Sequence, residues 1–494
     1  MDLGITWSLI LMSIVSFLIY SFTWRRRLRE KNMPPAPPLL PLLGNMLQIS
    51  AKEFPQSLIK LSEKLGPVFT VYLPNNPAVV LAGYDCIKEA LLDNNECFGA
   101  RGKSPLGYLL FKDYGVLSSN GTRWKQLRRF SLSCLRDLGM GKRSIEERIQ
   151  EEAKYLAEEL RQHADTPIDP TYLLTLAVSN VICSVVFGER FDYKDEKFMT
   201  LISLLKKVTS DLSSAWGILL SLFPKTLSRV PGPPQRIFRN FDKLKAFVAE
   251  SVKIHQETLN SDCPRDFIDS FLIKMEKEKN NPQTEFHLDN LLGTVLDLFI
   301  AGTETTSVTL KYSFLMLLKY TEFTRKTMEE IDNIIGQDRC PFYEDRMKMP
   351  YTNAVFHEIQ RVADIVPFGV PHGTTHDTIF RGYNIPKDTL IFPLMTSVLK
   401  DPKYFRDPKQ FDPAHFLDDN GRFKKNDAFL PFSIGKRSCL GEGLARMEIF
   451  IFLTTILQAF NLKSDTANQD IDITPEPNKN GTLPRAYKMY FVPK

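Results

Sequence analysis

The sequence predicts a mainly helical protein with small β-sheets. Apolar side chains recur at helical spacing over long stretches, whereas β-branched and aromatic runs are short and few. The composition, with 43% hydrophobic and 24% charged residues, is that of a folded globular protein. The periodic helical stretches are residues 143–161, 171–187, 241–259 and 324–335.

The strands and one central helix can be placed from local composition. The runs 68–73 and 78–81 flank a turn from Pro74 to Pro77 and predict a hairpin, and extended segments return near 378–392 and 487–492. Residues 284–320 contain no proline and are apolar on every face at their centre, which predicts a helix through the interior. Residues 230–234 are read as a loop between helices.

The N-terminus has the pattern of a membrane anchor. Residues 3–24 carry no charge and are about long enough to span a bilayer, and five cations follow at residues 25–31. The positive-inside rule then places the rest of the chain in the cytoplasm; a cleaved signal peptide is the alternative. We therefore expect an anchor with its basic flank at 1–33, a stiff proline-rich linker at 34–45 and one catalytic domain at 46–494.

Charge and cysteine usage exclude several classes of protein. The net charge of +5 is small for 494 residues, so nucleic acid is not an expected partner. The seven cysteines are widely spaced, odd in number and without a C-x-x-C pair, which argues against a disulfide framework and a zinc site. Six of them are expected to be small buried side chains, and Cys439 is the exception.

The stretch around Cys439 is the most specific motif. A thiolate that binds iron needs a tight loop, which Gly435 and Gly441 allow, and electrostatic support, which Arg437 is expected to provide. The pattern F-x-x-G-x-R-x-C-x-G at residues 432–441 is similar to the haem-binding loop of the cytochrome P450 superfamily. The resemblance extends over nearly the whole chain, includes the vertebrate microsomal family 2, and implies the P450 fold with haem b ligated by Cys439.

Two further elements agree with this resemblance. Glu358 and Arg361, three residues apart, share a helix face and resemble the family's structural ion pair. His415, in the segment 411–416, replaces the arginine that the wider superfamily often has as third partner. Trp124 and Arg128 lie one helical turn apart, so their N–H groups can bind one carboxylate from the same side. By resemblance the residues that hold the haem propionates are Arg101, Trp124, Arg128, His372 and Arg437.

The central helix carries a candidate oxygen site. Small residues at Ala301 and Gly302 are expected to admit a flat cofactor and a diatomic molecule, and Thr305 can return its hydroxyl to the carbonyl four residues earlier. Glu304 and Thr305 resemble the family's acid–alcohol pair, which relays protons during oxygen activation. A helix that merely tolerates threonines is the alternative.

The family's substrate-contact stretches match mostly apolar residues here, as a lipophilic pocket requires. Asp297 and Asn480 are the polar exceptions, and each either orients a substrate group or is satisfied by the backbone. The matching positions are Val116, Leu117, Asp297, Ile300, Ala301, Val366, Val370, Asn480 and Gly481.

The resemblance implies a monooxygenase of the endoplasmic reticulum membrane acting on xenobiotics, steroids, fatty acids or odorants. No nucleotide-binding glycine motif is present, so NADPH electrons are expected to arrive through NADPH–cytochrome P450 reductase, with cytochrome b5 as a possible helper. Two rivals are a haem-thiolate isomerase or dehydratase acting on peroxides, against which Glu304 and Thr305 argue, and a non-enzymatic membrane haem protein.

Two surfaces are predicted as well. An apolar cluster at residues 216–223 beside a proline-rich loop is a candidate second contact with lipid, with core packing as the alternative. A basic face is the candidate reductase surface, with an ordinary solvated face as the alternative. Its residues are Arg123, Lys125, Arg129, Lys142, Lys424, Lys425 and Lys436.

Overall fold

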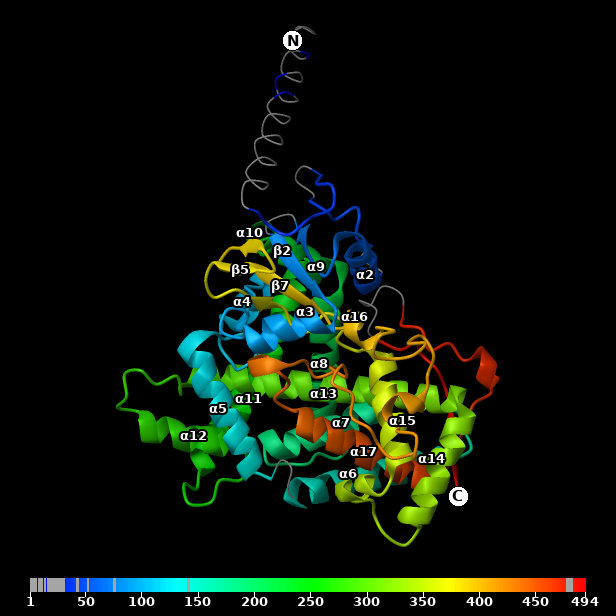
Figure 1. Ribbon diagram of the computed structural model, residues 1–494. Helices are drawn as coiled ribbons and strands as arrows, with labels where there is room; N and C mark the ends of the chain where they lie inside the picture. The colour runs from blue at the N-terminus through cyan, green and yellow to red at the C-terminus, as the bar shows by residue number, and fades with distance from the viewer. Residues whose placement is uncertain are drawn as a thin grey trace. The chain divides into compact units, whose positions relative to one another are not determined.

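A computed structural model describes Trp7, Met12, Val15 and residues 32–40, 44–50, 53–73, 77–139, 143–476 and 483–494 (Figure 1). The chain divides into two compact units. The sheet unit comprises Met1–Lys103 and Phe368–Ser397, and the helical unit comprises Ser104–Pro367 and Val398–Lys494.

The sheet unit is built on a five-stranded sheet with strand order β1-β2-β7-β4-β3. The antiparallel hairpin of β1 (Val68–Tyr72) and β2 (Pro77–Ala82) is the predicted one, and Phe69 pairs with Val80. β2 continues in parallel with β7 (Leu390–Leu394), while β4 (His372–Gly373) joins β7 to β3 (Ala100–Arg101). The remaining elements of this unit are α2 (Phe54–Leu65), α3 (Tyr84–Lys88), the π-helix η1 (Glu89–Asp93) and the hairpin of β5 (Thr378–Phe380) with β6 (Tyr383–Ile385).

The helical unit holds most of the helices. Its shorter elements are α4 (Pro105–Phe111), α9 (Ala215–Leu222), α10 (Pro224–Leu227), α12 (Phe267–Glu278), the single-turn helices η2 (Tyr343–Met347), η3 (Pro413–Phe416), η4 (Gly435–Arg437) and η5 (Asn468–Asp470), and the hairpin of β8 (Phe460–Lys463) with β9 (Tyr490–Pro493). Its longer helices are α5 (Gly121–Asp137), α6 (Arg143–Arg161), α7 (Thr171–Val186), α8 (Glu196–Ser213), α11 (Pro233–Thr258), α13 (Leu288–Lys319), α14 (Thr321–Ile334), α15 (Pro350–Ala363) and α17 (Glu442–Ala459). A single turn, α16 (Thr396–Leu399), straddles the division.

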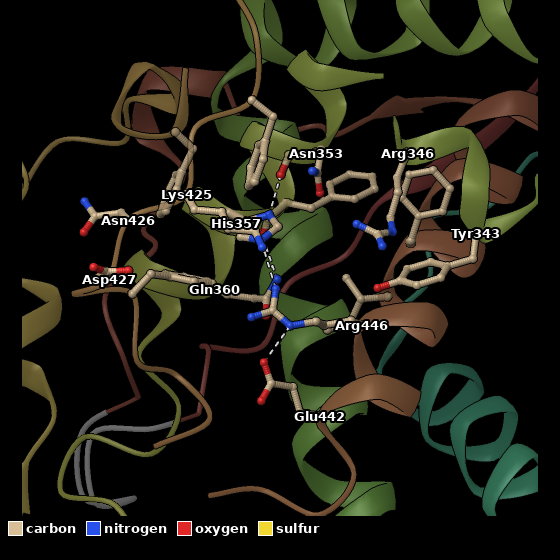
Figure 2. A pocket seen from close by; sticks show the side chains of 16 residues that line it. Tyr343, Arg346, Asn353, His357, Gln360, Lys425, Asn426, Asp427, Glu442 and Arg446 are labelled. Atoms are coloured by element: carbon tan, nitrogen blue, oxygen red, sulfur yellow. Dashed lines mark hydrogen bonds and ion pairs between the residues drawn. The ribbon is translucent and has the colours of Figure 1, made fainter. Parts of the chain in front are cut away.

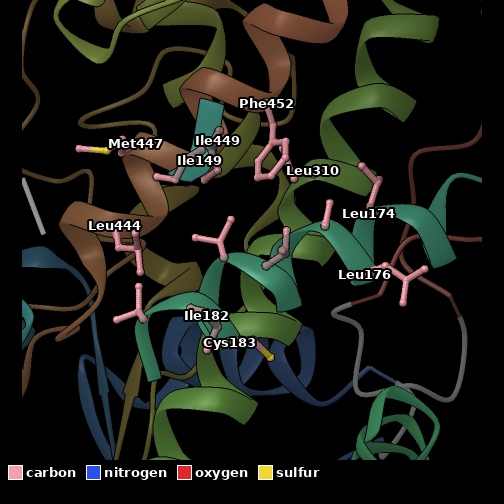
Figure 3. Close-up of a cluster of buried hydrophobic side chains, with 14 of the residues drawn as sticks. Ile149, Leu174, Leu176, Ile182, Cys183, Leu310, Leu444, Met447, Ile449 and Phe452 are labelled. Atoms are coloured by element: carbon pink, nitrogen blue, oxygen red, sulfur yellow. The ribbon is translucent and has the colours of Figure 1, made fainter. Parts of the chain in front are cut away.

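The core of the helical unit forms around α13, which packs against α7, α15 and α17 (Figures 1 and 3). Leu310 of α13, Leu174 of α7 and Phe452 of α17 are almost fully buried in this one cluster. Burying side chains of this size stabilises the fold by about 1.5–3 kcal/mol each. The predicted interior helix is therefore confirmed, although it begins at Leu288 rather than at residue 284.

Two sequence-based expectations need correction. Residues 233 and 234 belong to α11 rather than to a loop, because proline is tolerated in the first turn of a helix, where its missing amide has no partner to lose. Of the six cysteines expected to be buried, Cys263 is exposed and Cys340 is half-buried. Cys263 lies in the exposed turn before α12.

The predicted anchor at 3–24 and its basic flank lie outside the described residues, apart from Trp7, Met12 and Val15. Among the helices that the structure describes, none combines the length and the hydropathy needed to cross a bilayer.

Candidate functional site

The Cys439 loop joins residue 430 to the start of α17 through the single turn η4. Ser433 and Gly435 adopt left-handed backbone angles, with φ of 62° and 81°, and the amide of Cys439 donates to the carbonyl of Phe432 over 2.9 Å. Gly435 thus has the role expected of it, whereas Gly441 has φ of −94° and needs no special freedom. The second left-handed position falls on Ser433, which the sequence did not single out.

The electrostatic surroundings of Cys439 combine burial with stabilising donors. The residue is exposed, yet burial raises the pKa of its thiol, so the side chain lies recessed. The backbone amides of Gly441 and Glu442 and the guanidinium of Arg128 oppose that rise. Arg128 also donates to the carbonyl of Ser438 over 2.8 Å. Arg128 from α5 is therefore a cation that supports the thiolate, and the support expected from Arg437 stays a prediction.

Arg437 is turned toward the start of α5. Its guanidinium stacks on the Trp124 ring at 3.8 Å and donates to the carbonyl of Ser119 and to Oδ1 of Asn120. Both Arg437 and Trp124 are buried. The structure thus brings Trp124, Arg128, Arg437 and Cys439 together at the contact of α5 with the cysteine loop.

Arg101 and His372 lie in the sheet unit, where they are partners across β3 and β4. Arg101 donates to the carbonyl of Val370 over 3.0 Å, and Nδ1 of His372 donates to the carbonyl of Phe98 over 2.8 Å. A carbonyl only accepts, so this bond fixes the proton on Nδ1 and leaves Nε2 to face another group.

One face of α13 is open in the middle of an otherwise buried helix. Ala301 and Thr305, one turn apart, are exposed, although Phe299 and Thr303 are buried. The Thr305 hydroxyl donates to the Ala301 carbonyl over 2.7 Å, as the sequence predicted. Gly302 does not share this role, because a Cβ there would approach the Ile182 side chain to 2.5 Å. Gly302 lets α7 pack closely, and only Ala301 keeps the open face small.

Glu304 is held by α8. Its Oε1 accepts the hydroxyl of Thr209 over 3.3 Å, and burial raises the pKa of its carboxyl, while the Thr209 hydroxyl and Lys206 oppose this rise. A carboxyl with a raised pKa retains its proton closer to neutral pH and can act as a proton donor there.

Two of the predicted substrate stretches, the segment 116–117 and α13, meet at Asp297. The Asp297 carboxylate accepts the amide of Leu117 over 2.8 Å. Gly115, with φ of 87°, allows this approach, because a Cβ there would lie 2.9 Å from the Gly293 backbone. Asp297 thus has a backbone partner, which is the second of the two roles considered for it from the sequence. Gly115 and Gly293 were not identified from the sequence.

The other predicted substrate residues differ in burial. Val116 is buried, Leu117, Ile300 and Val366 are half-buried, and Val370, in the sheet unit, is exposed. Asn480 and Gly481 lie outside the described residues.

The predicted ion pair is formed and buried on α15. Arg361 meets Glu358 through two bonds of 2.6 and 2.7 Å, with both side chains fully buried, and donates to three backbone carbonyls. His415 completes the group through Nδ1, 3.2 Å from both carboxylate oxygens, and Glu358 raises the pKa of His415 against the effect of its burial. Removing one partner of such a pair is typically destabilising by about 3–5 kcal/mol.

Comparison with known proteins identifies the class. The family model described as Cytochrome P450 matches residues 34–491. The chain therefore belongs to the cytochrome P450 family and is a P450 monooxygenase, a class that carries haem with a thiolate ligand.

Its relatives are similar along nearly their whole length. The chain is 52% identical to Cytochrome P450 2C8 of Homo sapiens over 484 residues, covering 98% of this chain and 99% of the relative. It is 50% identical to Cytochrome P450 2A5 of Mus musculus, with 99% of each chain covered, and 52% identical to Cytochrome P450 2B4 of Oryctolagus cuniculus, with 93% and 94% covered.

The residues present fit a haem group. A recessed thiol with two backbone amides bonded to it and a guanidinium charge nearby is an environment that suits a thiolate ligand. Trp124 and Arg437 beside it offer N–H donors of the kind that bind carboxylates.

Proposed function

We propose that this protein is a membrane-bound monooxygenase that oxidises lipophilic small molecules with electrons from a separate reductase. The balanced reaction is RH + O2 + NADPH + H⁺ → ROH + NADP⁺ + H2O. The observation that carries the proposal is the recessed Cys439 thiol supported by Arg128, together with the open face of α13 at Ala301 and Thr305.

The haem would be held by Cys439 as the iron ligand and by five further residues, namely Arg101, Trp124, Arg128, His372 and Arg437. Bound there, haem supplies the chemistry that activates O2. The protein contributes the thiolate charge, which the amides of Gly441 and Glu442 and the Arg128 guanidinium stabilise.

The proton donors would be Glu304 and Thr305. The Glu304 carboxyl has a raised pKa and is oriented by Thr209, while Thr305 presents its hydroxyl on the open face of α13. This pair also argues against the peroxide isomerase or dehydratase, which has no use for added protons.

The substrate would contact Val116, Leu117, Ile300, Ala301, Val366, Val370, Asn480 and Gly481, with Asp297 positioning the segment 115–117. Most of these side chains are apolar, which favours lipophilic xenobiotics, steroids, fatty acids or odorants.

The deciding test is turnover with purified partners. Membranes containing the protein and NADPH–cytochrome P450 reductase are incubated with a mixed panel of lipophiles, and products are identified by mass. A gain of one oxygen atom that requires both NADPH and reductase is expected. Conversion without NADPH would favour the isomerase, and no conversion across the panel would favour the non-enzymatic haem protein.

The reductase, helped by cytochrome b5, would dock on a basic face. Lys125 and Arg129, one turn apart on α5, are exposed and make no ion pair with any residue that the structure describes. Lys424, Lys425 and Lys436 are exposed too, whereas Arg123 is engaged by Glu285 at 2.8 Å and Lys142 lies outside the described residues. Lys125 and Arg129 are therefore the best residues to test.

Reversing both charges, Lys125→Glu with Arg129→Glu, is expected to slow the first electron transfer severalfold, and more strongly at low ionic strength, because charge steering is screened by salt. Stopped-flow reduction measures the rate. Substrate-induced spectral shifts should not change. The control is Lys253→Glu, which reverses the charge of an exposed lysine on α11. Equal reduction rates in the wild type and all variants would mean that Lys125 and Arg129 belong to an ordinary solvated surface.

We also propose that the protein is anchored in the endoplasmic reticulum membrane by residues 1–33, joined through 34–45 to one cytoplasmic catalytic domain, and that α9 adds a second lipid contact. Trp216, Ile218 and Leu219 of α9 and the following Phe223 are each about two-fifths exposed, at 40%, 39%, 37% and 41%. Leu220 is fully buried, so α9 is amphipathic rather than wholly packed in the core.

A variant lacking residues 3–24 is expected to remain partly bound to lipid vesicles, and the further change Trp216→Ser with Leu219→Ser should reduce binding by about tenfold or more, since burying each side chain is worth about 1.5–3 kcal/mol. Vesicle flotation at low and high salt measures this. Ile254→Ser, an exposed apolar residue on α11, is the control. A fully soluble truncated protein at both salt concentrations would contradict the second contact.

A further inference from the structure

A polar cavity of about 460 Å³ lies in the helical unit (Figure 2). Its wall is formed by η2, α15, the segment 416–429 and the first turns of α17. This volume is in the range of small-molecule sites. Neither the proposed haem residues nor the proposed substrate residues line it.

Three polar side chains on the wall are incompletely satisfied. The Arg346 guanidinium stacks on Tyr343 at 4.4 Å, but it makes no hydrogen bond or ion pair with any described residue. The Asn353 amide, only 7% exposed, likewise has no partner within the described part of the chain. Gln360, 8% exposed, uses its amide nitrogen on the Phe356 carbonyl and leaves Oε1 without a donor. Buried polar groups of this kind normally have partners, so a ligand or water is expected to supply them.

The other charges on the wall are largely committed. Nε of Arg446 binds Glu442 at 3.0 Å, and its Nη1 donates to Nε2 of His357 over 2.9 Å. His357 donates from Nδ1 to the Asn353 carbonyl, and burial together with Arg446 lowers its pKa to about 3, so it stays neutral. Lys425 and Asp427 carry opposite charges and are both exposed to solvent. Arg346 is thus the half-buried cation of the wall that forms no ion pair with a described residue.

Much of the rest of the wall is aromatic. Phe356, Phe416, Phe423, Phe429 and Phe450 line the cavity, and Tyr343 stacks under Arg346. In Figure 2 the Arg346 guanidinium and the Asn353 amide lie along the same upper side of the cavity, with Gln360 and Arg446 below them. A ligand that matches all of these groups has an anion for Arg346 and Asn353, a flat ring for the phenylalanines and a donor for Gln360.

We propose that this cavity binds a small hydroxylated aromatic carboxylate, with the carboxylate on Arg346 and Asn353 and the hydroxyl donating to Gln360. A guanidinium and an amide are a suitable pair for a carboxylate, because both present N–H donors in a plane. The enclosing phenylalanines make that charge-assisted contact stronger than it would be in water.

The test uses 4-hydroxybenzoate as the probe and calorimetric titration of the haem-loaded protein, with a lipophilic azole added to fill the substrate site. One molecule is expected to bind per chain. Arg346→Gln should weaken binding by about tenfold or more, because it removes the charged donor that the carboxylate contacts. Lys348→Gln, an exposed residue two positions away that carries the same charge change, should leave binding unchanged.

Asn353→Leu is the second variant and should weaken binding even if Arg346→Gln folds poorly; an unchanged carbon-monoxide difference spectrum confirms the fold of each. Absence of binding to the wild type, or equal binding to both Arg346→Gln and Asn353→Leu, would overturn the proposal. Equal binding of neutral 4-hydroxybenzyl alcohol would show that the carboxylate plays no role. Displacement of the probe by equimolar inorganic sulfate would show that the cavity is a general oxyanion site. Either result also overturns the proposal.

Discussion

Replacing Cys439 with alanine is expected to abolish the red-shifted Soret band that the reduced, carbon-monoxide-treated protein shows when a thiolate is the axial ligand. Alanine provides no ligand atom, and no other described cysteine shares the loop with the amides of Gly441 and Glu442 and the Arg128 guanidinium that stabilise the thiolate. The expected loss is complete. Absorbance difference spectra of purified protein measure it directly.

A matched control separates the ligand from a general effect of losing a thiol. Cys263→Ala removes another exposed cysteine and should leave the band intact. Arg128→Gln should give an intermediate result, with a larger share of protein absorbing at the shorter wavelength, because the thiol is then deprotonated less readily. A Cys439→Ala protein that keeps the band would assign the ligand elsewhere.

Local patterns predicted much of the fold. The helix at residues 143–161 was predicted at its observed bounds, because its apolar spacing ends where α6 ends. The start of α11 was missed because prolines mark both loops and first helical turns, and composition alone does not separate the two. The hairpin of β1 and β2 followed from β-branched residues on either side of a turn, a pairing set by neighbours in sequence.

Long-range contacts account for the errors at the site. Arg128 was expected only to bind a haem propionate, but it reaches the cysteine loop from α5 and supports the thiolate there. Arg437, two residues from Cys439, stacks on Trp124 of α5, a contact that sequence distance does not reveal. Gly302 was assigned to the cofactor because it follows Ala301, but its missing side chain makes room for Ile182 of α7. The carboxylate cavity had no sequence signal, because its wall is assembled from segments that meet only in the folded unit.

Replacing Thr305 with alanine is expected to separate electron consumption from product formation. The hydroxyl lies on the open face of α13, bonded to the Ala301 carbonyl, and the Glu304 carboxyl behind it has a raised pKa. Without the hydroxyl, protons are no longer placed where O2 is reduced, and the electrons leave as hydrogen peroxide. Product per NADPH should fall by about tenfold or more, since a positioned proton donor is typically worth about 10²–10⁴ in rate.

The matched control is Thr309→Ala. Thr309 makes the same bond one turn along α13, from its hydroxyl to the Thr305 carbonyl over 2.8 Å, but it is buried. Losing that bond perturbs the helix equally and should leave coupling unchanged. Thr305→Ser, which keeps a hydroxyl, should restore most of the product yield.

Glu304 adds a dependence on pH with a definite sign. Because its pKa is raised, the carboxyl is protonated below that value and loses its proton as the pH rises through it. If the acid supplies protons through Thr305, product per NADPH should decline over that interval in the wild type, and Glu304→Gln should lower the yield and flatten the profile. Substrate binding spectra should be the same in all variants, because the change acts after substrate has bound. Product yields that are equal in Thr305→Ala and the wild type at every pH would reduce Thr305 to an ordinary helical residue.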